Sequence, residues 1–160
     1  MRTMRNRALV ALVVLAASGM GAVAAQDAGI PQKTGRFTIA PEVLSAHGPA
    51  VTGPLVQELV RRTGRRWLDL LPAEVKGPGW KQGNAIIEFV LHADGRVTNM
   101  MLARPSGSVA MDRAAWEAIA RSAPYEAFPK EVGLPEVRLQ LTFNYNEPET
   151  AEFHPAPVFR

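Results

Sequence analysis

Residues 84–104, NAIIEFVLHADGRVTNMMLAR, are the stretch of sequence that decides the fold. Asn84 to His92 is rich in β-branched and aromatic residues, which favours a strand. The turn Ala93-Asp94-Gly95 follows, and Asp and Gly tolerate the positive φ angles of tight hairpin turns. Arg96 to Arg104 then has the pattern of a returning strand. The stretch therefore predicts a β-hairpin.

Each strand of this hairpin has a predicted inner face. In the first strand, the residues that share one face and should enter the core are Ile87, Phe89 and Leu91. In the second strand, Val97 falls out of phase with Met100 and Leu102. We therefore expect a β-bulge near Thr98 or Asn99.

One helix is predicted before the hairpin in the sequence and another after it. Leu55 to Leu71 (LVQELVRRTGRRWLDLL) repeats apolar side chains at helical spacing and is followed by Pro72. Val109 to Ser122 (VAMDRAAWEAIARS) has a narrow apolar stripe of mostly small residues. Ser106 or Ser108 can cap this second helix by accepting a hydrogen bond from a free amide.

One more strand completes the expected architecture. Glu136 to Asn146 (EVRLQLTFNYN) alternates without interruption, which predicts a half-buried antiparallel strand. The element order predicts an α+β fold: a three-stranded antiparallel sheet with both helices packed on one face. A right-handed crossover gives the strand order second, first, third, so the third strand is an edge. The expected core includes Phe89, Leu91, Leu102, Ile119, Leu141 and Phe143.

Residues 1–25 have the three-part layout of a secretory signal peptide. Arg2, Arg5 and Arg7 precede an apolar run, and small residues follow at 22–25. We expect cleavage after Ala24 or Ala25 and a periplasmic location. The alternative is an uncleaved anchor in the inner membrane facing the periplasm, because about 18 uncharged residues are at the lower limit for spanning a bilayer.

The remaining segments are predicted to be irregular. Residues 26–53 are rich in Pro and Gly and have no sustained period, so we interpret them as a linker before a domain at 54–146. The alternative for part of this linker is that Arg36 to Ala40 (RFTIA) pairs as an extra strand. Residues 147–160 are Pro-rich and acidic, and we interpret them as a mobile tail.

The charge balance excludes nucleic-acid binding as the main function. The chain has 18 Lys and Arg against 15 Asp and Glu, and removal of residues 1–25 leaves 15 against 15. Binding to phosphates by counterion release needs a net cationic surface, which this mature chain lacks. One local cluster stands on the polar face of the first helix and consists of Arg61, Arg62, Arg65 and Arg66. It is either a solvated face or a contact for an anionic lipid or glycan.

Catalytic and metal chemistry is not expected. The chain has no cysteine, which excludes disulfides, thiolate metal sites and a cysteine nucleophile. His47, His92 and His154 lie on separate elements without metal-ligand spacing. Ser106 and Ser108 lack the G-x-S-x-G nucleophile elbow and are explained as helix caps. We predict no enzyme, no cofactor and no metal.

Several segments together resemble the C-terminal domain of the TonB and TolA family. They are Gly83 to Val97 (GNAIIEFVLHADGRV), Ser106 to Ala115 (SGSVAMDRAA), Ala123 to Pro129 (APYEAFP) and Leu139 to Phe143 (LQLTF). The first predicted helix, with Trp67 and a following proline, is similar to the first helix of that domain. The resemblance covers roughly residues 54–146, and the order of its motifs is more specific than any one of them.

The resemblance implies a non-enzymatic periplasmic module that binds a short peptide of an envelope protein or outer-membrane receptor as an added strand. It also implies a possible link to energy-coupled transport across the envelope. The docking residues would be those of the third-strand edge: Val137, Arg138, Leu139, Gln140, Leu141, Thr142, Phe143, Asn144 and Tyr145. Two other occupants of that edge stay open, namely the tail and a second copy in a homodimer. The alternative function is a structural envelope protein that self-associates through the sheet edge or binds anionic glycan through the arginine cluster.

Overall fold

The computed structural model describes residues 13–14, 35–45 and 49–147. The predicted signal peptide, apart from residues 13–14, and the predicted tail, apart from residue 147, lie outside these described residues. No helix among the described residues is long and apolar enough to cross a membrane.

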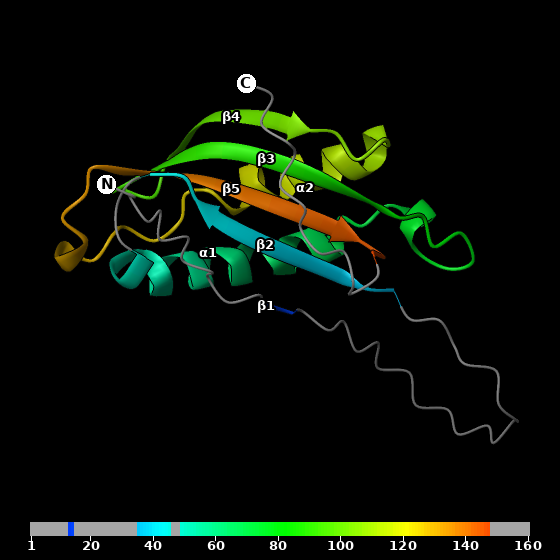
Figure 1. Ribbon diagram of the computed structural model, residues 1–160, viewed down its shortest axis with the longest axis horizontal. Coiled ribbons are helices and arrows are strands. Elements are labelled where there is room, and N and C mark those ends of the chain that lie inside the picture. Colours follow the sequence, from blue (N-terminus) through cyan, green and yellow to red (C-terminus); the bar gives the residue numbers. More distant parts are fainter. Residues whose placement is uncertain (1–12, 15–34, 46–48, 148–160) are drawn as a thin grey trace, which may run out of the picture.

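An antiparallel sheet forms one layer of the molecule, in the order β1-β2-β5-β3-β4. Strands β2, β5, β3 and β4 form its body and lie side by side in Figure 1. Their bounds are β2 Phe37–Val43, β3 Gly83–His92, β4 Val97–Arg104 and β5 Glu136–Tyr145. The first strand, β1 Val13–Val14, has two residues and pairs with the outer edge of β2.

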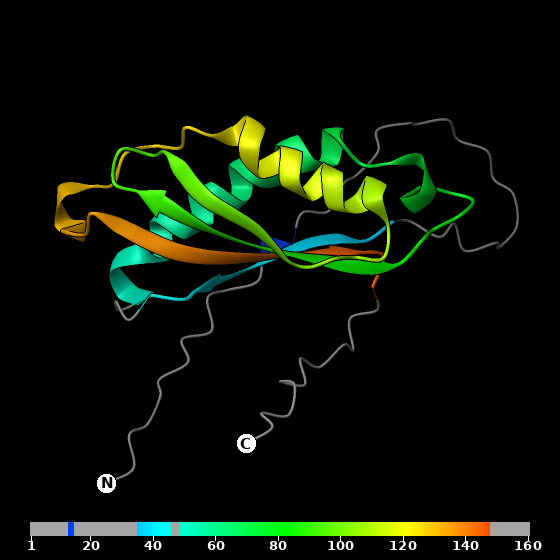
Figure 2. The same cartoon turned by 90° about the horizontal axis from the view of Figure 1, so that it is seen from above.

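Two helices form the second layer. They are α1 Pro49–Asp69 and α2 Val109–Ser122, and Figure 2 shows both over the same face of the sheet. Two short 3₁₀ turns, η1 Ala73–Val75 and η2 Lys130–Val132, lie in the connections. The α+β class and the placement of both helices on one face are confirmed.

The predicted hairpin is confirmed, including its bulge. The pairing of β3 with β4 shifts register between Glu88 and Val90, opposite Met101 and Thr98, and Asn99 has a φ of 52°. The turn needs glycine for two reasons. Gly95 has a φ of 86°, and a Cβ there would collide with the carbonyl oxygen of Tyr125.

Helix α2 has the predicted bounds and the predicted cap, since the Ser108 side chain accepts a hydrogen bond from the Met111 amide. Helix α1 begins earlier than predicted, at Pro49 instead of Leu55. Pro54 therefore lies inside the helix, close to its start, where its missing N–H removes only one bond of the helical ladder.

The core lies between the helices and the sheet. Trp67 of α1 is 1% exposed and packs edge-on against three aromatic rings, which are Phe37, Phe143 and Tyr145. Five of the six predicted core residues are buried: Phe89, Leu91, Ile119, Leu141 and Phe143. The sixth prediction is wrong. Leu102 is 37% exposed, because β4 is the outermost strand and the helices cover it incompletely.

The predicted three-stranded sheet is wrong in its strand count and in its edge. The order of the three expected strands is confirmed, but β2 pairs with the far side of β5 from Phe37↔Tyr145 to Val43↔Leu139. The expected linker at 26–53 therefore contains a strand. Its apolar side chains explain the pairing, because Phe37 and Ile39 are 7% and 0% exposed. Strand β5, expected to be an edge, lies inside the sheet.

Candidate functional site

The nine residues predicted to dock a partner lie together on β5, but neither side of that strand is free. Its backbone pairs with β2 on one side and with β3 on the other. The five side chains on its inner face are buried: Val137, Leu139, Leu141, Phe143 and Tyr145. The four on its outer face are Arg138, Gln140, Thr142 and Asn144. The open edge on which the docking prediction rests is therefore absent in this arrangement.

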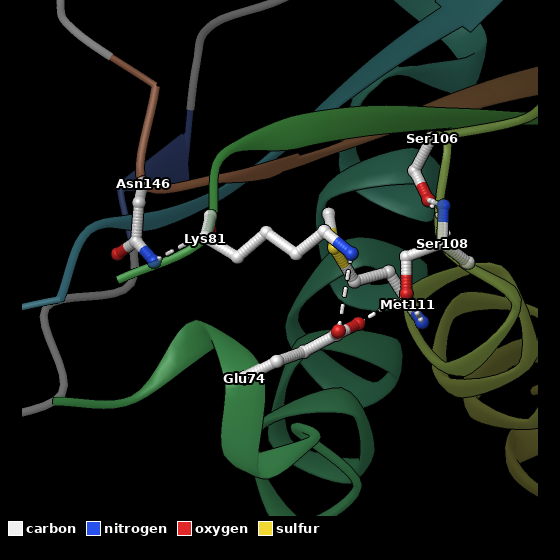
Figure 3. A network of polar contacts seen from close by, with 6 residues as sticks. All are labelled: Glu74, Lys81, Ser106, Ser108, Met111 and Asn146. Carbon is white, nitrogen blue, oxygen red and sulfur yellow. Dashed lines mark hydrogen bonds and ion pairs between the residues drawn. The ribbon is translucent and has the colours of Figure 1, made fainter. Parts of the chain in front are cut away.

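Asn146 fastens the start of β2 to the end of β5. Its backbone amide donates to the Arg36 carbonyl at 2.6 Å, and its Oδ1 accepts from the Arg36 amide at 3.0 Å. Its Nδ2 donates to the carbonyls of Val75 and Lys81, at 2.7 and 3.0 Å (Figure 3). The φ of Asn146 is 54°, a left-handed conformation that Asn tolerates better than most residues. One side chain thus joins three segments of the chain.

A second set of bonds fastens the other end of β2. The Leu44 amide donates to the Arg138 carbonyl at 2.9 Å, and the Arg138 amide donates to Ser45 Oγ at 2.7 Å. Between the two ends, Asn144 Nδ2 donates to Thr38 Oγ1 at 3.1 Å. Strand β2 is therefore held to β5 along its whole length.

Two other edges of the sheet remain, and they differ in how well they could accept a strand. The outer edge of β2 contains Pro41, which has no amide to donate, and it pairs with β1, which belongs to the predicted signal peptide and would be lost on cleavage. A proline in an edge strand directs its missing donor position away from the sheet, so this edge lacks a hydrogen bond there. Within the part of the chain that the structure describes, strand β4 pairs with β3 alone, and it contains neither Pro nor Gly. The freer edge belongs to β4.

Exposed apolar side chains accompany the β4 edge. Met101 and Leu102 are 51% and 37% exposed, and Trp116 of the adjacent helix α2 is 38% exposed. The pairing with β3 shifts register near Asn99 and again at Ala103, so Met101 and Leu102 are the regularly paired residues within the part Met100 to Arg104. We call this part the β4 edge. This edge could have been found from the sequence, because residues 97–103 include two methionines and no charged residue.

A polar network holds the loop that follows the β4 edge (Figure 3). The Ser106 amide donates to Asp112 Oδ1 at 2.7 Å, and the Ser108 hydroxyl donates to Glu74. Lys81 Nζ binds the other oxygen of Glu74 at 3.1 Å. The Ser108 hydrogen bond and the Lys81 charge lower the pKa of the Glu74 carboxyl. Both serines thus have structural roles, as their interpretation as caps predicted.

The structure brings three of the four predicted arginines together. Arg61 makes a two-point contact with Glu58, at 2.8 and 2.5 Å. Arg62, Arg65 and Arg66 face a hollow beside the end of α2, and the Arg62 guanidinium lies 5.9 Å from the Tyr125 ring centre.

The described histidine makes polar contacts but belongs to no metal-binding group of described residues. His92 Nε2 lies 2.7 Å from Thr98 Oγ1, and its Nδ1 lies 3.5 Å from Glu136 Oε2. Within residues 13–14, 35–45 and 49–147, no group of three or more His, Cys, Asp and Glu is placed to hold a metal ion. His47 and His154 lie outside the described residues.

Comparison with known proteins finds similarity in the part of the chain that contains β3, β4, α2 and β5. Residues 79–146 match the family described as Gram-negative bacterial TonB protein C-terminal, which confirms the resemblance over β3, β4, α2 and β5. The solution structure of the Helicobacter pylori TonB C-terminal domain is similar at 22% identity and a TM-score of 0.47, covering 63% of this chain and 88% of that one. No curated protein matches the chain.

Proposed function

We propose that this chain, whose residues 79–146 match the TonB C-terminal family, is a non-enzymatic interaction module of the cell envelope that binds an extended partner segment at the β4 edge. The observation that carries the proposal is the asymmetry of the sheet. Among the described strands, β5 has a neighbour on each side, whereas β4 has a neighbour on one side only. Free amides and carbonyls on an edge strand are a template for another strand.

The proposed partner segment is extended, apolar at alternate positions and acidic at one end. Main-chain hydrogen bonds would supply much of the affinity, and the alternate apolar side chains would contact Leu102, which shares the helix-covered face of the sheet with Ile87. Arg104 ends the strand, is exposed, and makes no ion pair with another described residue. An acidic residue of the partner opposite Arg104 would therefore fix the register.

Charge argues against a second copy of the chain as this partner. Antiparallel pairing of two whole β4 strands places Arg104 of each copy opposite Val97 of the other, next to Arg96. Two such like-charge contacts would form in a symmetric pair, and like charges opposite one another destabilise a sheet. A different protein with an acidic segment avoids this cost.

Strand β5 is the second docking position, and binding there requires β2 to leave. The bonds of Asn146 and Ser45 at the two ends of β2 oppose that departure, as does the burial of Phe37 and Ile39. The β4 edge needs no such rearrangement, and it is therefore the proposed position.

The proposal extends to location and to cellular role. We infer a periplasmic protein exported through residues 1–25, with a role in envelope transport that is coupled to a partner protein. Detection of residues 26–160 by intact-mass measurement of periplasmic extract would support export, whereas recovery of the uncut chain from membranes alone would favour an anchored protein.

Position-specific photocrosslinking tests the docking site in intact cells. A photoreactive phenylalanine analogue replaces Met101 on β4, Gln140 on β5 or Arg113 on α2, in three separate proteins. We expect a discrete partner band from position 101 and none from positions 140 and 113. A band from position 140 alone would contradict docking at the β4 edge.

Proline substitution then separates strand addition from simple apolar contact. Neighbouring residues of a strand direct their amides to opposite sides, so either Met101 or Leu102 donates outward. Proline at the outward residue should abolish the crosslink formed from a neighbouring position, such as Ala103, while the thermal unfolding midpoint stays within a few degrees. Retention of the crosslink by both proline variants would contradict main-chain pairing.

A further inference from the structure

An open hollow of about 270 Å³ lies where the second half of α1 meets the end of α2. Three of its lining residues are the arginines of α1 that face this side, and the other two are acidic or polar. The lining residues are Arg62, Arg65, Arg66, Asp69 and Ser122. The hollow therefore has three positive charges against one negative charge. It is separate from the β4 edge and from the β5 strand.

These arginines differ from most other basic residues of the described chain in having no carboxylate partner. Lys81, Arg96, Arg113, Arg121 and Arg138 each lie within 4.0 Å of a Glu or Asp oxygen, as does Arg61. Arg65 and Arg66 make no such pair with any described residue, although Asp69 lies one turn further along the helix. Like charges at i,i+3 and i,i+4 destabilise a helix, so the cluster carries a cost that Glu58 and Asp69 offset only in part.

Two of the three arginines have a local explanation, and one has none. Arg62 lies over the ring of Tyr125, and Arg66 stands in the last turn of α1, where a positive charge is favourable. Arg65 has neither role, and it extends from the same helix face between them.

A buried hydroxyl lies against the same hollow. Ser122 is 2% exposed, and among the described residues its Oγ is the buried side-chain polar atom without a hydrogen bond of regular geometry, although the Tyr125 hydroxyl lies close to it. A buried hydroxyl without a partner is costly, and each such group in a folded protein calls for an explanation.

We propose that this hollow binds an oxyanion, either a phosphate or a carboxylate, held by Arg65 and Arg66 with Ser122 as an additional donor. Guanidinium groups match both anions, because each presents a planar set of N–H donors to two oxygens. A small rotation of the Ser122 side chain would direct its hydroxyl toward the same anion. Envelope polymers carry both kinds of group, so the experiment has an arm for each.

Nuclear magnetic resonance titration of the full chain with inorganic phosphate, and separately with acetate, measures the binding. The observed signals are the side-chain Nε–Hε groups of the arginines and the backbone amide of Ser122. We expect saturable shifts at Arg65, Arg66 and Ser122, with small shifts at Arg113, which already binds Glu117. Saturation by phosphate alone assigns a phosphate site, and saturation by acetate as well assigns a general oxyanion site.

Three variants make the assignment specific. Arg65→Gln should weaken binding about fivefold or more, because it removes a charge-assisted contact. Asp69→Asn should tighten binding about twofold or more, because it removes the negative charge that borders the hollow. Arg113→Gln is the matched control on α2 and should leave the affinity unchanged.

The outcomes separate a site from general attraction to a basic surface. Equal, non-saturating shifts at all arginines, or equal effects of Arg65→Gln and Arg113→Gln, would overturn the proposal. Opposite effects of Arg65→Gln and Asp69→Asn would support it, since both exposed substitutions leave the fold intact and a loss of folding cannot tighten binding. The result is independent of whether a partner docks at β4.

Discussion

Asn146 and Arg36 exchange two hydrogen bonds, one between their backbones and one from the Arg36 amide to the Asn146 side chain. These bonds close the end of the β2–β5 ladder, so that β5 has neighbours on both sides. The strand that sequence alone places at the edge is thereby removed from the surface available to a partner. The freer edge of the described sheet therefore lies at β4.

Asn146 should contribute strongly to stability. Asn146→Ala removes one acceptor and two donor contacts, and it leaves the carbonyls of Val75 and Lys81 without this partner. We expect a loss of about 2 to 4 kcal/mol in the free energy of unfolding. Urea unfolding measures it. Asn144→Ala is the control, because Asn144 makes a single side-chain bond to Thr38, and it should cost less than about 1 kcal/mol.

The Trp67–Tyr145 contact should be energetically coupled. Trp67 Nε1 donates to the Tyr145 hydroxyl at 2.8 Å, and that hydroxyl donates to the Met111 carbonyl at 2.6 Å. Tyr145→Phe should destabilise by about 1 to 3 kcal/mol, because it leaves the buried Trp67 N–H unpaired and removes the second bond to the Met111 carbonyl. A double-mutant cycle with Trp67→Phe measures the coupling. Strict additivity of the two substitutions would contradict this arrangement.

The aromatic core should respond to truncation, and the β4 edge should not. Phe89 and Phe143 are 1% and 0% exposed, so replacing either by Ala should cost about 3 to 5 kcal/mol. Met101→Ala, on the exposed edge, should change stability by less than about 0.5 kcal/mol. Thermal and urea unfolding of the three variants measure these changes in the free energy of unfolding. A destabilisation by Met101→Ala as large as that by Phe89→Ala would contradict the exposure of β4.

Stability should fall in acid partly through Glu74. Ser108 and Lys81 lower the pKa of this carboxyl in the folded protein, so the unfolded chain binds its proton more readily. The stabilising contribution is therefore present at neutral pH and is lost as the pH falls below about 4.3, the ordinary pKa of a glutamate. Glu74→Gln should make unfolding less dependent on pH between about 3 and 5. Glu131→Gln, on an exposed 3₁₀ turn, is the control for loss of a surface carboxylate.

Local patterns in the sequence were sufficient for the hairpin and for α2. Asp94 and Gly95 mark the turn, and Ser108 marks the helix start, because turn and cap chemistry act between residues close in sequence. The out-of-phase Val97 was sufficient to predict the bulge. The predicted inner faces of β3 and β5 followed from alternation alone.

The sequence was not sufficient for the outcome at β5. Pro41 suggests a linker, and pairing of Phe37 with Tyr145 joins residues more than 100 positions apart, which no local pattern specifies. The exposure of Leu102 could not be predicted from local sequence either. Its phase indicates a core residue, but its exposure depends on how far the helices extend over the last strand of the sheet.

Amide hydrogen exchange of the free protein tests the central claim, that β4 and not β5 carries the edge open to a partner. We expect slow exchange at every amide from Val137 to Tyr145, and fast exchange at alternate amides from Met100 to Arg104. Fast exchange at alternate amides of β5, together with protection of all amides of β4, would contradict the account.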